Sequence, residues 1–225
     1  MVDNETPEPD PRSGNDDDPL RDRVLLETLP HVAFEGWSNR SLRNGLADAG
    51  VSAEHGALIF PGGAPEMVEH WSRWADARML EAMQLIDVDA LRLRDRIASA
   101  LRARLEVNVP YQEAVRRTLA WSSLPANTPL ALRCTWETVN SVWYACGDTS
   151  TDFSFYSKRA SLAAVYGATV LYWLDDESEE FVDTWAFLDR RIDDVMRFPR
   201  LQTKLQETMS GLRLPRLRIP HIPRA

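Results

Sequence analysis

The stretch from Trp143 to Trp173 constrains the fold of this chain more than any other. After a polar turn and a group of aromatic residues it becomes almost wholly apolar. Its small residues recur at the spacing of one helix face, and they are Ala160, Ala163, Ala164, Gly167 and Ala168. A helix face without large side chains either admits a second helix at close range or leaves room for a long apolar ligand. The stretch therefore predicts a helix. Its small-residue face can serve either as a close helix contact or as a ligand site, and the sequence leaves both alternatives open.

Helical signals continue through the rest of the chain, and no strand pattern interrupts them. We therefore expect an all-α protein with about ten helices. The expected parts are a disordered acidic tail over 1–20, a helix-turn-helix-like region over 21–63, a helical core over 64–196, and a basic amphipathic helix with a tail over 197–225. The core is large enough to bury an apolar interior, since 44% of the 225 residues are hydrophobic.

Charge and cysteine content narrow the classes of function. The net charge of −8 argues against broad phosphate binding, although residues 197–225 carry seven bases and one acid. Cys134 and Cys146 match no metal or disulfide framework, so we expect free thiols. The four histidines are scattered without metal-ligand spacing. We expect no catalytic residues, no metal, no cofactor and no enzymatic activity.

The first three predicted helices resemble the DNA-binding region of TetR-type regulators. The cues are Gly36 after the first helix, the turn over Ala49 to Ser52, and Phe60-Pro61 after the third helix. The would-be recognition segment offers Glu54 and His55 but no Lys or Arg, whereas a major-groove helix normally sits among phosphate contacts. We expect no nucleic-acid partner. A TetR-type ligand-responsive transcriptional repressor is the alternative function.

A second resemblance is more specific. The motif residues are Trp143 to Ala145, Gly147 and Asp148, Ser150 to Phe153, Phe155 and Tyr156, Arg159 and Ala160, Leu162 to Ala164, and Tyr166. Together with matches elsewhere over about residues 22–198, they resemble the lipid-binding protein nine family of ubiquinone (coenzyme Q) biosynthesis. The chain has Phe155 where we expect Trp in that family, and Lys158 where we expect Arg.

The resemblance implies a TetR-like fold without DNA binding, and an accessory protein without activity of its own. Such a protein binds an isoprenoid or quinone lipid and presents it to the di-iron demethoxyubiquinone hydroxylase at the membrane. Carried over by position, the partner surface is Asp152, Phe155, Tyr156 and Arg159. Aromatic residues and Arg are typical interface anchors. The alternative is that Tyr156 belongs to the core and Phe155 only covers a neighbour.

The lipid pocket is expected where the small-residue face of the helix after residue 153 lies opposite large apolar stripes. Its candidate lining residues are Leu119, Trp136, Val139, Ala163, Ala164, Gly167 and Trp185. Tight packing without any void is the alternative for these same residues.

The basic C-terminal segment has an amphipathic pattern that suits a membrane interface. Its candidate contact residues are Phe198, Leu201, Lys204, Leu205, Met209 and Leu212. Packing of this helix on the core is the alternative. Because we find no signal peptide or transit sequence, we expect a protein of the bacterial cytoplasm, peripheral on the inner face of the cytoplasmic membrane. TetR-like folds commonly pair through their last long helices, so we also expect a homodimer.

Overall fold

The computed structural model describes residues 19–148 and 153–211, and within these ranges it contains helices and no strands. The α-helices are α1 (Pro19–Glu35), α2 (Asn39–Asp48), α3 (Ala53–Ile59), α4 (Ala64–Gln84), α5 (Leu93–Glu106), α6 (Gln112–Ser122), α7 (Thr128–Ala145), α8 (Phe153–Leu174) and α9 (Val182–Gly211). Short 3-10 turns lie at Val88–Ala90 (η1), Val109–Tyr111 (η2) and Glu179–Phe181 (η3). The predicted all-α architecture is confirmed.

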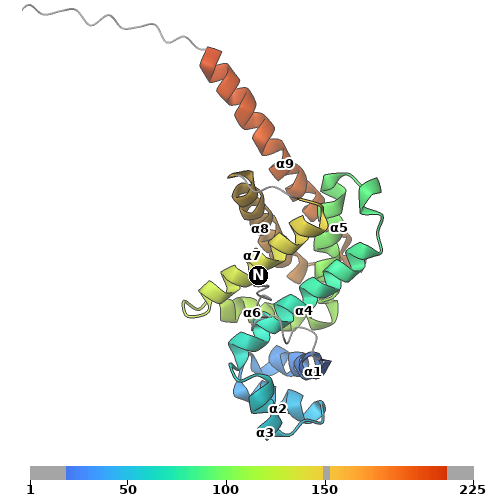
Figure 1. The fold of residues 1–225 in the computed structure, drawn as a ribbon, viewed down its shortest axis with the longest axis vertical. Coiled ribbons are helices and arrows are strands. Elements are labelled where there is room, and N and C mark those ends of the chain that lie inside the picture. Colours follow the sequence, from blue (N-terminus) through green and yellow to red (C-terminus); the bar gives the residue numbers. More distant parts are fainter. Residues whose placement is uncertain (1–18, 149–152, 212–225) are drawn as a thin grey trace, which may run out of the picture.

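The three N-terminal helices form a small bundle at one end of the molecule (Figure 1). Ser38 begins α2 with a capping box, in which its hydroxyl accepts from the Ser41 amide and the Ser41 hydroxyl accepts from the Ser38 amide. Helices α1 and α2 approach so closely that a Cβ at Gly45 would lie 2.0 Å from Thr28 Oγ1. The bundle encloses Val24, Leu25, Leu29, Leu46 and Phe60. This is the predicted helix-turn-helix-like region.

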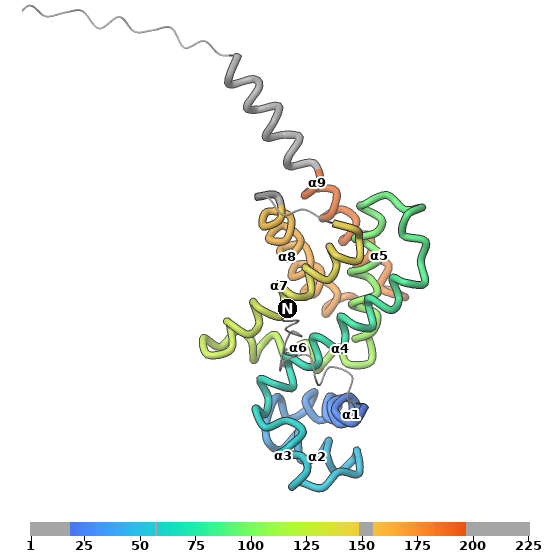
Figure 2. Tube along the Cα trace, viewed as in Figure 1, coloured from blue at the N-terminus to red at the C-terminus, as the bar shows by residue number. Residues whose placement is uncertain are grey.

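Helix α4 leads from this small bundle into a larger one built from α4, α5, α7, α8 and α9, with α6 between the two (Figure 2). Each of the five helices contributes a fully buried apolar side chain to one core, namely Met79, Leu101, Val139, Leu162 and Leu188. Burial of such side chains supplies roughly 1.5–3 kcal/mol each, which makes this core the main source of stability.

The basic amphipathic helix that we expected within 197–225 is not a separate helix. The structure has a single helix, α9, which runs from Val182 to Gly211 and contains the first part of that segment. A proline removes one backbone hydrogen bond without removing the helical preference of its neighbours, and the residues that follow Pro199 include the strong helix formers Leu201, Gln202 and Lys204.

The turn between α8 and α9 is organised by Asp176. Its carboxylate accepts hydrogen bonds from the Ser178 amide, at 2.8 Å, and from the amide and hydroxyl of Thr184. Partial burial raises the pKa of Asp176, but these hydrogen bonds outweigh burial and bring the pKa to about 2. This carboxylate therefore caps the start of α9.

A charged pair fastens α4 to α5 and α7 inside the larger bundle. Arg104 Nε of α5 donates to Asp76 Oδ1 of α4 at 2.6 Å, and Thr138 Oγ1 of α7 contacts both Asp76 oxygens at 2.9 and 3.0 Å. All three residues are buried. Because an unpaired charge in this environment is very unfavourable, the three helices hold one another in register.

The first prediction concerns the Asp176 cap. We expect Asp176→Asn to lower the free energy of unfolding by about 1 kcal/mol at pH 7, because the amide cannot accept from all three donors. The folded-state pKa is depressed from 3.8 to about 2, so the difference is complete above pH 4 and shrinks as the pH falls toward 2. Urea denaturation across this range measures it. Asp175→Asn is the control, because Asp175 accepts none of these three hydrogen bonds. If the free energy of unfolding of Asp176→Asn differed from that of the unmodified chain by the same amount at every pH, the result would contradict a capping role for the ionised carboxylate.

The second prediction concerns the buried pair. We expect Asp76→Ala to lower the free energy of unfolding by about 3–5 kcal/mol, since it leaves the Arg104 guanidinium buried without its counter-charge. Glu81→Ala is the matched control, because it removes a carboxylate that pairs with Arg78 on the exposed surface of the same helix. The control is expected to lose less than about 1 kcal/mol. Equal losses in urea denaturation would show that the Asp76 pair does not hold the bundle together.

Candidate ligand cavity and aromatic patch

A cavity of about 190 Å³ lies inside the larger bundle, between α4, α5, α6, α7 and α8. Its wall is mostly apolar, and its principal lining residues are Val68, Trp71, Leu105, Val115, Leu119, Cys134, Tyr166, Gly167, Val170 and Trp173. Empty cavities of this size are uncommon in well-packed cores. The cavity is therefore the first candidate for a ligand site.

Helix α8 forms one wall of the cavity and one side of its mouth. Tyr166, Val170 and Trp173 recur at helical spacing and form one face toward the cavity. Gly167 lies beside them with no atom within 4 Å of the place a Cβ would occupy, so this point is open. Leu119 of α6 also lines the cavity and is 37% exposed. The mouth therefore lies between α6 and α8.

Arg104 is the charged group of this wall, and its pair with Asp76 keeps it neutralised. Burial lowers the pKa of Arg104, but Tyr166 and Asp76 outweigh burial, so the pKa is raised and the guanidinium stays charged. Burial raises the pKa of Asp76, and Arg104 opposes that shift. With the carboxylate accepting from Arg104 Nε and from the Thr138 hydroxyl, the pair is ionised and brings no net charge to the cavity.

The cysteines add no reactive chemistry to the site. Cys134 lines the cavity, and burial raises the pKa of its thiol to about 11. Cys146 lies in the main core, where burial raises its pKa to about 12. Both are neutral at physiological pH and behave as small apolar side chains. The part of the chain that the structure describes also contains no group of three or more His, Cys, Asp or Glu placed to hold a metal ion.

The structure places only two of the seven predicted lipid-lining residues, Leu119 and Gly167, at the cavity. Val139 is fully buried in the main core, while Ala163 and Trp185 pack against that core. Ala164 is exposed, and Trp136 lies in the aromatic patch described below. Sequence reasoning missed Trp71, Tyr166 and Trp173. The spacing of Tyr166, Val170 and Trp173 could have signalled a second face of α8, but not what it faces.

A patch of three aromatic rings joins α7 to α8, and we call Trp136, Phe155 and Tyr156 the aromatic patch. The Tyr156 ring is stacked on Trp136 at 6.2 Å between centroids and meets Phe155 edge-on at 5.1 Å. Tyr156 is 62% exposed and Trp136 is 37% exposed. Tyr156 is therefore not a core residue. Exposed aromatic clusters of this kind are typical of interface anchors.

Arg159, which we predicted in the partner surface, lies beneath the aromatic patch. It is only 3% exposed, and its guanidinium lies 3.4 Å from the Phe155 ring centroid. It also donates to Asn140 Oδ1 at 2.9 Å and to Asp148 Oδ2 at 3.3 Å. This residue orients Phe155 and fixes the start of α8, so its contribution to any interface is indirect.

Several predicted residues fall where the structure gives no description. Asp152 of the partner surface and Leu212 of the membrane segment lie outside the described residues. For the other membrane candidates, Phe198, Leu201, Lys204, Leu205 and Met209, only the backbone of α9 is described. In the described part of the chain, no helix combines the length and apolar character needed to span a bilayer.

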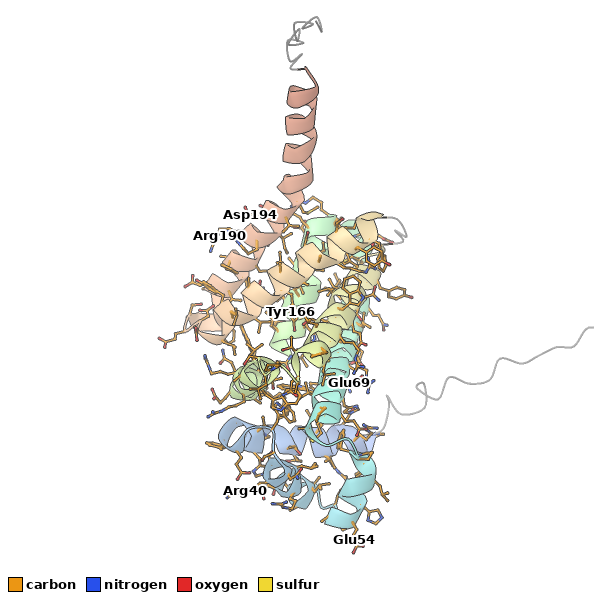
Figure 3. The ribbon with its side chains drawn as sticks, turned by 90° about the vertical axis from the view of Figure 1, so that its left-hand side faces the viewer. Arg40, Glu54, Glu69, Tyr166, Arg190 and Asp194 are labelled. Carbon is orange, nitrogen blue, oxygen red and sulfur yellow. The ribbon has the colours of Figure 1, made fainter. Side chains whose placement is uncertain are left out.

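The third helix of the N-terminal bundle lacks the charge of a DNA-reading helix. Residues Ala53–Ile59 of α3 include Glu54 and His55 and no Lys or Arg. Figure 3 shows Glu54 at the far end of this bundle, pointing away from the rest of the molecule. A negative side chain at this position repels phosphate groups.

The chain was compared with known proteins. A family model described as COQ9 matches residues 128–199, which cover α7, α8 and the first part of α9. The ubiquinone biosynthesis protein COQ9, mitochondrial, of Rattus norvegicus is 30% identical over 200 residues, or 86% of this chain and 64% of that protein. The protein of the same name from Drosophila melanogaster is 32% identical over 196 residues, or 85% of this chain and 59% of that protein. The chain thus spans less than two thirds of the length of these relatives.

These relatives correct one prediction. They are mitochondrial proteins by name, so the expected location in the bacterial cytoplasm, on the inner face of the cytoplasmic membrane, is contradicted. That expectation rested on finding no signal peptide or transit sequence, which is a poor guide to location.

A solved structure confirms the fold. The TetR transcriptional regulator from Nitrosomonas europaea ATCC 19718 superposes with a TM-score of 0.67 at 23% identity, over 80% of this chain and 99% of that one. At such identity the likeness establishes the TetR-like fold alone. The COQ9 model matches the helices that carry the aromatic patch and one wall of the cavity, and the COQ9 relatives match over most of this chain, so the chain is similar to COQ9 proteins along most of its length.

Proposed function

We propose that this chain is a non-enzymatic accessory protein of ubiquinone biosynthesis that binds an isoprenoid or quinone lipid and presents it to the demethoxyubiquinone hydroxylase. The observation that carries the proposal is the largely apolar cavity with its mouth between α6 and α8. Similarity to relatives that are named ubiquinone biosynthesis proteins supports the choice of pathway.

The cavity supports the binding half of the proposal. Transfer of apolar surface from water into such a wall is favourable by roughly 25 cal/mol per Å². The mouth opens beside the exposed residue Gly167 of α8, where no neighbouring side chain fills the space, so a long apolar chain has room to leave the cavity there. The cavity wall carries no net charge that would repel such a ligand.

The aromatic patch supports the second part of the proposal, which is docking to the hydroxylase. Trp136, Phe155 and Tyr156 offer a contiguous aromatic surface, and Arg159 holds Phe155 from below. Burial of such rings against a partner typically dominates the energy of an interface. Contact of residues 197–225 with a membrane surface and pairing of two copies through α8 and α9 remain predictions in this scheme.

The repressor alternative has little support beyond the shared fold. A recognition helix normally carries basic side chains for phosphate contacts, and the residues of α3 include none. The cavity alone fits either function, because TetR-like regulators also need a ligand site.

The third prediction tests lipid binding. Solvent extraction and mass spectrometry of the purified full chain are expected to recover a quinone or isoprenoid lipid. Gly167→Leu places a side chain in the mouth and should lower the recovered lipid several-fold, since the position is helical and otherwise open. Ala160→Leu is the control, because it is exposed on the same helix away from the cavity. Absence of lipid from the unmodified chain, or equal amounts in both variants, would count against the proposal.

The fourth prediction tests the aromatic patch. Tyr156→Ala is expected to weaken binding to the purified hydroxylase by about tenfold to thirtyfold, as measured by surface plasmon resonance, because truncation of a hot-spot aromatic removes about 2 kcal/mol. Tyr144→Ala removes an equally exposed aromatic of α7 that makes no ring contact with the patch. We expect this control to bind normally. Normal binding by Tyr156→Ala as well would place the docking surface elsewhere.

A further inference from the structure

The connection between α4 and α5 exposes large apolar side chains. Leu85 follows directly after α4 and is 90% exposed, and its neighbour Ile86 is 37% exposed. Leu93 begins α5 and is 39% exposed. We call Leu85, Ile86 and Leu93 the α4–α5 tip. Single apolar residues on a surface are ordinary, but three of them within nine residues of chain indicate contact with apolar material that the described residues do not supply.

Helix α9 leaves the larger bundle beside this tip. Arg94, near the start of α5, pairs with Asp193 of α9 at 2.8 Å. Further along α5, the Arg102 guanidinium lies 4.9 Å from the ring centroid of Trp185, which comes earlier in α9. The two helices are therefore antiparallel, and α9 runs toward the start of α5 as it reaches Met196, which is 40% exposed. Figure 1 and Figure 2 show this end of the molecule opposite the N-terminal bundle.

The segment that continues from this point has a charge that complements an anionic lipid surface. Residues 197–225 carry seven bases and one acid. Such a segment is attracted to the negative surface of a bilayer, and the attraction falls off within a Debye length, about 8 Å at physiological salt. A bilayer that binds the start of this segment would lie against the end of the molecule that carries the α4–α5 tip. The charge of the chain therefore indicates that lipid is what covers the tip.

The tip itself has no net charge, so its own contact with a bilayer is apolar. Residues 85–96 contain three acids and three bases, which balance. Arg92 Nε pairs with Asp95 at 2.9 Å, and Arg96 Nη2 lies 3.7 Å from Asp89. An exposed arginine such as Arg92 can keep its charge among lipid head groups while its stem lies along apolar surface. Leu85, the most exposed apolar residue of the tip, gains most from burial in lipid.

We propose that the α4–α5 tip inserts Leu85 and Ile86 into the boundary between head groups and acyl chains of an anionic lipid bilayer, beside the point where residues 197–225 continue α9. The chain then contacts the membrane at two places, one apolar and one basic, and the N-terminal bundle lies farthest from the lipid. None of the tip residues lines the cavity or belongs to the aromatic patch. The inference can therefore fail while the proposed function stands.

The first measurement is cosedimentation of the full chain with vesicles of phosphatidylcholine and phosphatidylglycerol. Leu85→Ser is expected to weaken vesicle binding about fivefold, because the gain from burying the leucine side chain is lost. The fivefold difference should persist at high salt, since only the basic segment binds through charge. Phe34→Ser is the matched control, because Phe34 is 86% exposed near the end of α1, in the N-terminal bundle. We expect it to bind vesicles normally, and circular dichroism checks that both variants fold.

The second measurement places a fluorescent reporter at the tip. Leu85→Cys and Phe34→Cys are each labelled with a polarity-sensitive fluorophore, which Cys134 and Cys146 do not take up readily because both are buried. We expect the emission at position 85 to shift to the blue when vesicles are added, and the emission at position 34 to stay unchanged.

Four results would overturn this inference. They are no vesicle binding by the unmodified chain, equal binding by Leu85→Ser, no emission shift at position 85, and the same shift at positions 85 and 34. Recovery of a lipid from the purified chain, which tests the proposed function, does not depend on any of them.

Discussion

The buried pair of Asp76 and Arg104 is the interaction on which the larger bundle depends. It joins α4 to α5, and Thr138 extends it to α7. Removing either charge would leave the other in an apolar interior, so the three helices must keep their relative positions. A cavity beside such a pair can remain open, because the surrounding helices are held by the pair as well as by packing.

The same pair also shapes one wall of the cavity. Because Asp76 engages Nε and the Ser72 carbonyl engages Nη2, the guanidinium of Arg104 is held in one orientation. The wall of the cavity is otherwise mostly apolar, which favours partition of a lipid into it.

The TetR-like fold has been adapted at two surfaces in this chain. At the N-terminal end, α3 keeps the shape of a recognition helix while carrying Glu54 and no basic residue. At the junction of α7 and α8, Trp136 and Tyr156 expose aromatic rings that a monomeric protein rarely leaves in water. These differences in surface chemistry, and not the backbone, separate a lipid-presenting protein from a regulator in the scheme proposed here.

The sequence by itself determined the helical architecture and the family motif, because periodicity and motif matches are properties of residues close together in the chain. It also predicted exposed aromatics at Phe155 and Tyr156. It did not determine the cavity, which only Leu119 and Gly167 of the predicted lining residues border. Five helices surround that space, and the pattern of one helix states which side chains share a face without stating what that face meets. Only the tertiary structure decided that Trp136 joins the surface patch, that Arg159 lies beneath it and that Tyr166 faces the cavity.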